Sequence, residues 1–280
     1  MKGSFSFPLP CRSFLNWGAS LLIYHLHFCY DTTDMETTLD SIRDIQIHQS
    51  RNGYRFSIDA LLLYSFVNLP TVKRIADLGS GSGIVGILLA KKYSQSQVIL
   101  LELQETLVNL AVKNVKQNRL EERVTVVGCD IRKLGDRDTE GQILPGSSVD
   151  LVVSNPPFRR PKAGLISPEE EKAIARHEIK LGLPELISAA RFLLRAKGRF
   201  VLIYHPSRLS ELAETVKGKG MEIKRLRFVH SHAASEAKMV LVEAVKDGRR
   251  GIKVEKPMYI YHANGGYTEE VRELCSGTSK

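Results

Sequence analysis

An asparagine, two prolines and a phenylalanine stand directly after an apolar run, as Asn155-Pro156-Pro157-Phe158 following Val149–Ser154. Because proline cannot donate a ladder hydrogen bond, the predicted strand must end here, and a rigid loop follows. The loop holds an amide and an aromatic ring at the carboxyl end of a strand, which is where open α/β sheets bind ligands. An ordinary Asn-Pro turn is the competing interpretation.

A glycine-rich turn is the second chemical signal. Residues 77–83 are Asp-Leu-Gly-Ser-Gly-Ser-Gly, between a predicted strand and a predicted helix. Glycines let backbone amides approach a ligand closely, and the free N–H groups of the helix start point the same way. The turn therefore indicates a nucleotide or nucleoside site. Gly81, Gly83 and Gly86 also satisfy the dinucleotide fingerprint, so a nicotinamide-dependent dehydrogenase is a competing hypothesis.

Acids at the ends of the predicted strands help to decide whether the turn binds a nicotinamide dinucleotide or another nucleoside. Glu102 follows the glycine turn by about twenty residues, where a carboxylate can accept both hydroxyls of a ribose. Asp130 follows the third strand and could accept from an exocyclic adenine amine, and Asp77 stands ahead of the first glycine. A dehydrogenase needs neither Asp77 nor Asp130. The acid set therefore weighs against that hypothesis.

Together with the proline motif, the pattern resembles class I S-adenosylmethionine-dependent methyltransferases that act on an exocyclic or amide nitrogen. The resemblance covers residues 42–245. It implies S-adenosyl-L-methionine as the cofactor, bound by Phe56, Asp77, Gly79, Ser80, Gly81, Gly83, Glu102, Leu103, Asp130, Ile131 and Asn155. It also implies a catalytic set made of Asn155, Pro156, Pro157 and Phe158.

Less specific sequence matches point to one family among these methyltransferases. Residues 53–63, Gly-Tyr-Arg-Phe-Ser-Ile-Asp-Ala-Leu-Leu-Leu, are similar to the family that methylates N6 of an adenosine beside the anticodon of valine tRNA. Phe56 and Asp59 could equally mark an ordinary helix start, because acids are common there. Three further segments are similar to that family: Arg176-His177-Glu178, Tyr261 and Gly265-Gly266-Tyr267-Thr268. The first of these could also be an exposed charged turn.

The implied chemistry depends mainly on positioning. A sulfonium methyl group is already electrophilic, so the enzyme must place the acceptor nitrogen in line with it and exclude water; no metal is required. The Asn155 oxygen and the Pro156 carbonyl would accept the two amine hydrogens and steady the developing charge. Phe158 would stack on the extruded base. Basic residues after the ring would contact RNA phosphates: Arg159, Arg160 and Lys162.

Composition permits one large domain with a basic surface. The chain has 280 residues, of which 43% are hydrophobic, and Lys plus Arg number 40 against 31 acids, giving a net charge of +9. This balance suits a polyanionic partner, although an ordinary solvated surface also explains it. The family resemblance implies that the partner is RNA, most simply tRNA. Four cysteines without paired or metal-type spacing predict reduced thiols and a cytoplasmic protein. We expect a monomer that needs no membrane. A later basic group is either near the pocket or merely solvated: Arg249, Arg250, Lys253 and Lys256.

Hydrophobic periodicity predicts an α/β fold, a doubly wound Rossmann-like sheet of seven mostly parallel strands with an antiparallel last pair and helices on both faces. The expected strands cover residues 74–78, 98–102, 124–127, 150–153, 200–204, 223–229 and 238–245. The expected helices cover residues 58–68, 84–92, 104–118, 183–196 and 206–217.

The domain organisation is predicted to be simple. Residues 1–34 are expected to form a poorly ordered extension, because polar residues interrupt their apolar stretch and disfavour a signal peptide or membrane anchor. Residues 35–280 are expected to form a single methyltransferase domain, with 35–70 as a cap segment and 246–280 as a tail. A chain that begins at Met35 is expected to fold and to remain active.

Two other functions stay open at this point. One is a different nitrogen methyltransferase of the Asn-Pro-Pro type, acting on a ribosomal RNA guanine or on a release-factor glutamine. The glutamine enzymes are less similar, because they usually carry tyrosine at the place of Phe158 and a helical substrate domain that residues 35–70 do not suggest. The other is a non-catalytic RNA-binding module, against which the intact acids and Asn155 weigh. His230 and His232 lack neighbours at metal-ligand spacing, which predicts a surface or edge-strand role.

Overall fold

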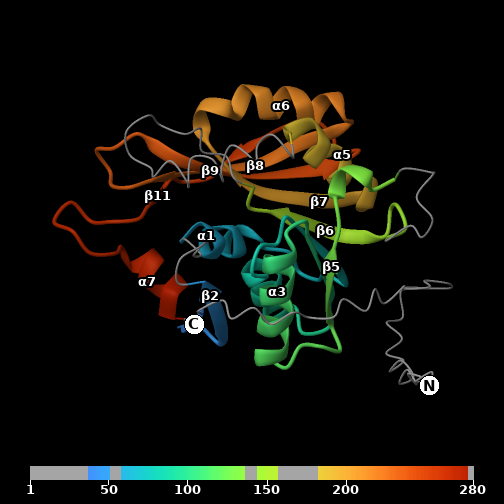
Figure 1. Cartoon of the computed structure of the whole chain (residues 1–280). Helices are drawn as coiled ribbons and strands as arrows, with labels where there is room; N and C mark the ends of the chain where they lie inside the picture. The colour runs from blue at the N-terminus through green and yellow to red at the C-terminus, as the bar shows by residue number, and fades with distance from the viewer. Residues whose placement is uncertain (1–36, 51–57, 136–143, 157–181, 277–280) are drawn as a thin grey trace, which may run out of the picture.

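The computed structural model describes residues 37–50, 58–135, 144–156 and 182–276 (Figure 1). Several predictions concern residues outside these ranges: the extension 1–34, Phe56, Pro157, Phe158, Arg159, Arg160, Lys162 and Arg176-His177-Glu178.

A single large sheet crosses the molecule, in the strand order β10-β8-β9-β7-β6-β3-β4-β5, with β11 also paired to β8. The parallel strands are β3 (Arg74–Leu78), β4 (Gln97–Glu102), β5 (Val124–Gly128), β6 (Val149–Ser154) and β7 (Leu194–Tyr204). Strand β9 (Ala237–Lys246) runs antiparallel to both β7 and β8 (Met221–His230). The strand order reverses between β3 and β6, which is the switch point where sheets of this class bind ligands.

The predicted fold class is confirmed, with two additions to the sheet. All seven expected strands are present, and the short strands β10 (Lys253–Val254) and β11 (Met258–Tyr259) extend the sheet to nine. Both pair with β8, so the tail of the chain follows the outer edge of the sheet.

Helices cover both faces of the sheet (Figure 1). One face carries α1 (Ile58–Phe66), α2 (Ile84–Lys92) and α3 (Glu105–Gln117), and the other carries α5 (Leu183–Leu193) and α6 (Leu209–Gly218). The central strands read as nearly continuous apolar runs because both of their faces are buried.

The prediction for the junction between α5 and β7 was wrong. The helix expected over 183–196 ends at Leu193, and the strand begins at Leu194 instead of Phe200. Leu194 pairs with Val149 of β6, and a register shift follows before Leu151 pairs with Arg199. Tertiary pairing therefore overrides a local pattern that continues the helix. The helix expected over 206–217 begins with a 3-10 turn, Pro206–Arg208, before α6.

The cap segment contains a β-hairpin that periodicity did not predict. Strands β1 (Thr37–Ile42) and β2 (Ile45–Ser50) pair with each other, and β2 packs against α3. The tail adds α7 (Glu269–Ser276), whose last turn receives hydrogen bonds from Arg43, in the turn between β1 and β2. The two ends of the described chain are thus tied together beside α1.

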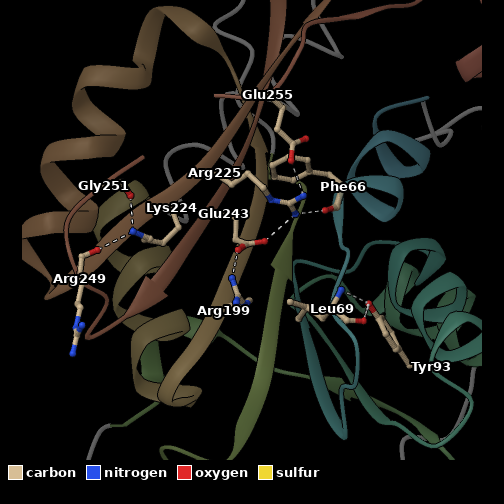
Figure 2. A network of polar contacts seen from close by, with 10 residues as sticks. All are labelled: Phe66, Leu69, Tyr93, Arg199, Lys224, Arg225, Glu243, Arg249, Gly251 and Glu255. Atoms are coloured by element: carbon tan, nitrogen blue, oxygen red, sulfur yellow. Dashed lines mark hydrogen bonds and ion pairs between the residues drawn. The ribbon is translucent and has the colours of Figure 1, made fainter. Parts of the chain in front are cut away.

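A polar network fastens the antiparallel half of the sheet to α1 (Figure 2). The Glu243 carboxylate of β9 pairs with Arg199 of β7 and with Arg225 of β8, the latter at 2.9 Å. The Arg225 guanidinium also donates to the Phe66 carbonyl at the end of α1, and it lies 4.0 Å from the centre of the Phe66 ring. Glu255 completes the set with an ion pair to Arg225 at 3.1 Å.

Part of the later basic group lies away from the strand ends that carry the motifs. Arg249 and Arg250 follow β9, which ends at the amino edge of the parallel strands, and Lys224 donates to the Arg249 carbonyl at 3.0 Å (Figure 2). Lys253 lies in β10, beside Arg225 near the middle of β8. Of the two alternatives for this group, the solvated loop is favoured for Arg249 and Arg250, because an antiparallel strand delivers its following loop to the opposite edge.

Candidate active site

The glycine turn between β3 and α2 folds over the end of β4. Gly79, Gly81 and Gly83 have φ values of 68°, 56° and 84°, a region that side chains disfavour. The Gly79 and Ser80 amides donate to the Leu101 carbonyl at 2.9 and 3.1 Å. The turn is therefore a fixed cradle at the switch point of the sheet.

Glu102 organises this cradle. Its side chain is only 5% exposed, and its carboxylate accepts from the amides of Gly81, Leu103 and Gln104, each at 2.9 Å. Within the described ranges this carboxylate forms no ion pair. A carboxylate offers about four lone-pair sites, so three such bonds leave capacity for a ligand hydroxyl. Leu103, by contrast, presents an exposed side chain.

Asp77 lies beneath the turn. It is 2% exposed, and its carboxylate accepts from the Gly86 amide in the first turns of α2 at 3.0 Å. Burial raises the pKa of Asp77 to about 7; the Gly86 N–H opposes this shift and Glu102 adds to it. A Cβ at Gly86 would lie 2.2 Å from Leu100 Cδ2, so this glycine serves close helix-to-strand packing.

The Ser80 hydroxyl is buried without a partner. Ser80 is 8% exposed, and no hydrogen bond reaches its Oγ in the described structure. Buried polar atoms are normally satisfied, and an orphan in a glycine turn is the kind of atom that a bound molecule completes.

Asp130 is engaged differently from the prediction. Its carboxylate accepts from the Arg132 amide at 3.0 Å and forms a two-pronged ion pair with the Arg132 side chain. The hydrogen bond from Arg132 lowers the pKa of Asp130. An adenine amine would thus have to share these oxygens with a guanidinium. Ile131, the next residue, is buried.

Asn155 and Pro156 stand at the adjoining strand end. The Ser154 hydroxyl donates to the Leu78 carbonyl at 2.8 Å, which ties the end of β6 to the start of the glycine turn. Asn155 and Pro156 follow immediately and are half-buried. The contacts among described residues leave the Asn155 amide without a hydrogen-bond partner. The structure therefore places Asn155 beside the glycine turn, which contains Ser80 and donates the Gly81 amide to Glu102.

Asn114 is a site residue that sequence reasoning missed. It is fully buried on α3, where its oxygen accepts from the His48 amide at 2.7 Å and its nitrogen donates to the Ser82 carbonyl at 2.9 Å. Asn118, one turn later, makes equivalent bonds to Gln46 of β2. The signal was present as two asparagines four residues apart on an apolar helix face. They hold the hairpin and the glycine turn together.

Other chemistry finds no support in the described part of the chain. Burial raises the pKa of the Cys129 thiol to about 12, helped by Asp130 and Glu102, so this thiol is a poor nucleophile. His230 lies in β8, where its ring contacts the Ser235 carbonyl at 2.7 Å. No cluster of three metal-ligating side chains occurs in the described ranges.

None of the described helices is long and apolar enough to cross a bilayer.

Comparison with known proteins identifies the family. Residues 56–215 match the model of the methyltransferase small domain. The chain belongs to this family. The prediction of a methyltransferase is thereby confirmed, and the dehydrogenase hypothesis falls away.

Several relatives of this methyltransferase carry one name. A protein of Porphyromonas gingivalis named tRNA1(Val) (adenine(37)-N6)-methyltransferase is 29% identical over 213 residues, which cover 75% of this chain and 81% of the relative. A protein of the same name from Dyadobacter fermentans is 23% identical over 224 residues, which cover 80% and 89%.

Solved structures share the fold. A predicted O-methyltransferase from Agrobacterium tumefaciens superimposes with a TM-score of 0.60 and 23% identity, covering 78% of this chain and 96% of its own. Pyrococcus horikoshii TYW2 in complex with MeSAdo gives a TM-score of 0.52 and 15% identity, covering 76% and 73%. At these identities the likeness concerns the fold alone.

Proposed function

We propose that this methyltransferase transfers a methyl group from S-adenosylmethionine to N6 of an adenine in tRNA, at the adenosine next to the anticodon of a valine tRNA. The observation that carries the proposal is the position of the Asn155 amide beside the glycine turn, where no described residue forms a hydrogen bond with it. The relatives named tRNA1(Val) (adenine(37)-N6)-methyltransferase support this choice of substrate. We expect the enzyme to act in the cytoplasm.

The residues of the turn suit this cofactor. Glu102 would accept a ribose hydroxyl with its remaining lone-pair capacity, and the orphan Ser80 hydroxyl would gain a partner. The uncompensated negative charge of Glu102 also favours a cationic ligand in a partly dry crevice. S-adenosylmethionine supplies an electrophilic methyl group on a sulfonium centre.

The strand end after β6 would hold the acceptor base. The Asn155 Oδ1 atom and the Pro156 carbonyl would accept the two hydrogens of the adenine amine, so that its lone pair turns toward the methyl donor. The Ser154 bond to Leu78 fixes the strand end, which keeps these acceptors in place without reorganisation during transfer. An anticodon loop is single-stranded, so presenting one base costs less than opening a duplex.

Nucleoside mass spectrometry of tRNA and rRNA from cells with and without the gene tests the substrate. We expect N6-methyladenosine to disappear from one tRNA. Loss of a methylated guanine from rRNA instead would assign a different acceptor, and an unchanged nucleoside profile would point to a protein acceptor.

Asn155→Ala tests the mechanism. Removing one preorganised polar group from such a site lowers turnover by about 100- to 1,000-fold, and we expect a loss of this size with unchanged cofactor affinity. Single-turnover methyl transfer and calorimetric titration measure the two quantities. Asn68→Ala, at an exposed position after α1, is the matched control. Full turnover in Asn155→Ala would remove this residue from its proposed role.

A further inference from the structure

Two exposed tyrosines in the tail are stacked on each other. Tyr261 and Tyr267 are 43% and 41% exposed, yet their ring centres lie 5.3 Å apart with an angle of only 14° between the planes. They lie between β11 and α7, in the segment that Figure 1 shows projecting beyond the sheet. Exposed aromatic rings in this arrangement are uncommon unless something else fixes them.

The backbone fixes this pair. Tyr261 and Tyr267 face each other across an antiparallel bridge, closed by a hydrogen bond from the His262 amide to the Gly266 carbonyl at 3.0 Å. Gly265 and Gly266 turn the chain with φ values of 86° and 77°. Thr268 anchors the end of the turn through its hydroxyl, which donates to the Tyr259 carbonyl at 2.7 Å. The two rings are therefore preorganised without being buried.

The pair stands at the same edge of the sheet as the candidate active site. Strand β8 runs parallel to β7, since β9 is antiparallel to both, so His230 at its end shares an edge with the end of β6. The Ile260 amide donates to the His230 carbonyl at 2.9 Å, and the Tyr261 amide donates to the Ser231 carbonyl at 2.8 Å. The tyrosine turn thus continues the carboxyl edge where Asn155 lies.

The charges around the turn include cations that a polyanion could contact. Two nearby acids are ion-paired, Glu270 with Arg227 at 2.7 Å and Glu269 with Arg272, while Glu236 and Glu273 are exposed. Exposed basic side chains belong to the same region, at the start of β9 and just before β11: Lys238 and Lys256.

We propose that Tyr261 and Tyr267 form a stacking platform for an unpaired nucleobase of the RNA substrate. The inference rests on the proposed function, since it assigns a second contact to the same RNA. Rigid aromatic faces bind single-stranded bases with little dependence on sequence, and nearby lysines add phosphate contacts. The platform positions the loop while Asn155 holds the target amine.

The test compares alanine and phenylalanine variants of both tyrosines. Anisotropy of a labelled valine-tRNA anticodon stem-loop, measured without cofactor, gives RNA affinity. We expect Tyr261→Ala and Tyr267→Ala each to weaken binding roughly tenfold, whereas the phenylalanine variants bind as the wild type does. KM for RNA rises while cofactor affinity stays unchanged. Ile252→Ala, 53% exposed near the opposite edge, is the matched control.

The outcomes separate this inference from the proposed function. Alanine variants that fold and bind RNA with wild-type affinity would overturn the platform even if the wild type methylates tRNA. Wild-type protein that binds the stem-loop through these tyrosines but methylates no tRNA would overturn the proposed function alone. If the alanine variants do not fold, Tyr267→Trp provides a fluorescent probe in a chain whose sequence contains one other tryptophan, Trp17. RNA that fails to quench the new signal, or a protein ligand that quenches it in place of RNA, would also overturn the platform.

Discussion

Glu102 and Glu243 are buried to nearly the same degree in the same sheet, yet their partners differ completely. Among the described residues, Glu102 at the end of β4 accepts only from backbone amides, whereas Glu243 in β9 is held between two arginines. The second arrangement cancels the charge of the acid and joins β7, β8 and α1. The first leaves the carboxylate without a cationic partner among the described residues.

This contrast shows that burial alone does not mark a functional acid. A buried carboxylate with cationic partners is costly to disturb and contributes to the structure. A buried carboxylate held by backbone amides alone is a candidate for contact with a ligand. We therefore expect the acid of β4 to contribute mainly to ligand binding. We expect the acid of the antiparallel half to contribute mainly to the stability of the fold.

The largest effect is expected from Glu243→Gln. The substitution leaves Arg199 without this partner and Arg225 with Glu255 alone, and breaking a buried ion pair typically costs about 3 to 5 kcal/mol of unfolding free energy. Denaturant titration measures the loss, and the remaining folded protein should bind cofactor normally. Glu236→Gln, at an exposed position, is the control. A loss of unfolding free energy below about 1 kcal/mol would mean that Glu243 does not stabilise the antiparallel half as this comparison requires.

Asp77→Asn should change how stability depends on pH. Because burial raises the pKa of Asp77 from 3.8 to about 7, the folded state holds this proton more tightly than the unfolded chain does. The resulting stability is fully present below the unfolded pKa and is lost as pH rises through the folded pKa. From pH 5 to 7 the wild type should lose about 2 kcal/mol through this group.

The amide that Asp77→Asn introduces can still accept from the Gly86 N–H, so the variant should lack this pH-dependent part while keeping the bond. Denaturation curves for both proteins at pH 5, 6 and 7 compare the slopes. Equal slopes would mean that Asp77 titrates as an ordinary carboxyl group.

Glu102→Gln should weaken cofactor binding and leave stability less affected than Glu243→Gln does. Loss of one charge-assisted hydrogen bond is worth about 1.5 kcal/mol, or roughly a tenfold rise in Kd for S-adenosylmethionine. Isothermal titration measures the affinity, and denaturant titration measures stability. Unchanged affinity together with a large loss of stability would make Glu102 a structural acid like Glu243.

The smallest effect is expected from Ser80→Ala. Its hydroxyl has no partner to lose among the described residues, so stability should be unchanged while cofactor affinity falls about fivefold, the value of one neutral hydrogen bond. Ser154→Ala is the opposite case, because its hydroxyl already donates to Leu78; it should cost about 1 kcal/mol of stability. Thermal melts and titrations of both variants decide whether the two serines differ in this way.

The strands and helices around the glycine turn could be predicted because their signals are local. The predicted strand 74–78 and helix 84–92 agree with β3 and α2 residue for residue, since a glycine run separates two clear apolar patterns. The hairpin β1–β2 could not be predicted in the same way. Its pairing partners include side chains of α3, Asn114 and Asn118, which lie far along the chain.

The candidate site shows the same difference between local signals and contacts made by residues far apart in the chain. The sequence by itself determined which residues lie at the strand ends, namely the glycine turn, Glu102, Asp130 and Asn155. These residues are adjacent in the sequence to the apolar runs that form the strands, so a local pattern is enough to find them. The Asp130 pair with Arg132 is local, because the two residues stand two positions apart. Only the tertiary structure decided the contacts of the other acids: Asp77 accepts from the Gly86 amide of α2, and Glu243 pairs with arginines of β7 and β8, because these contacts depend on the distances that packing sets between separate elements.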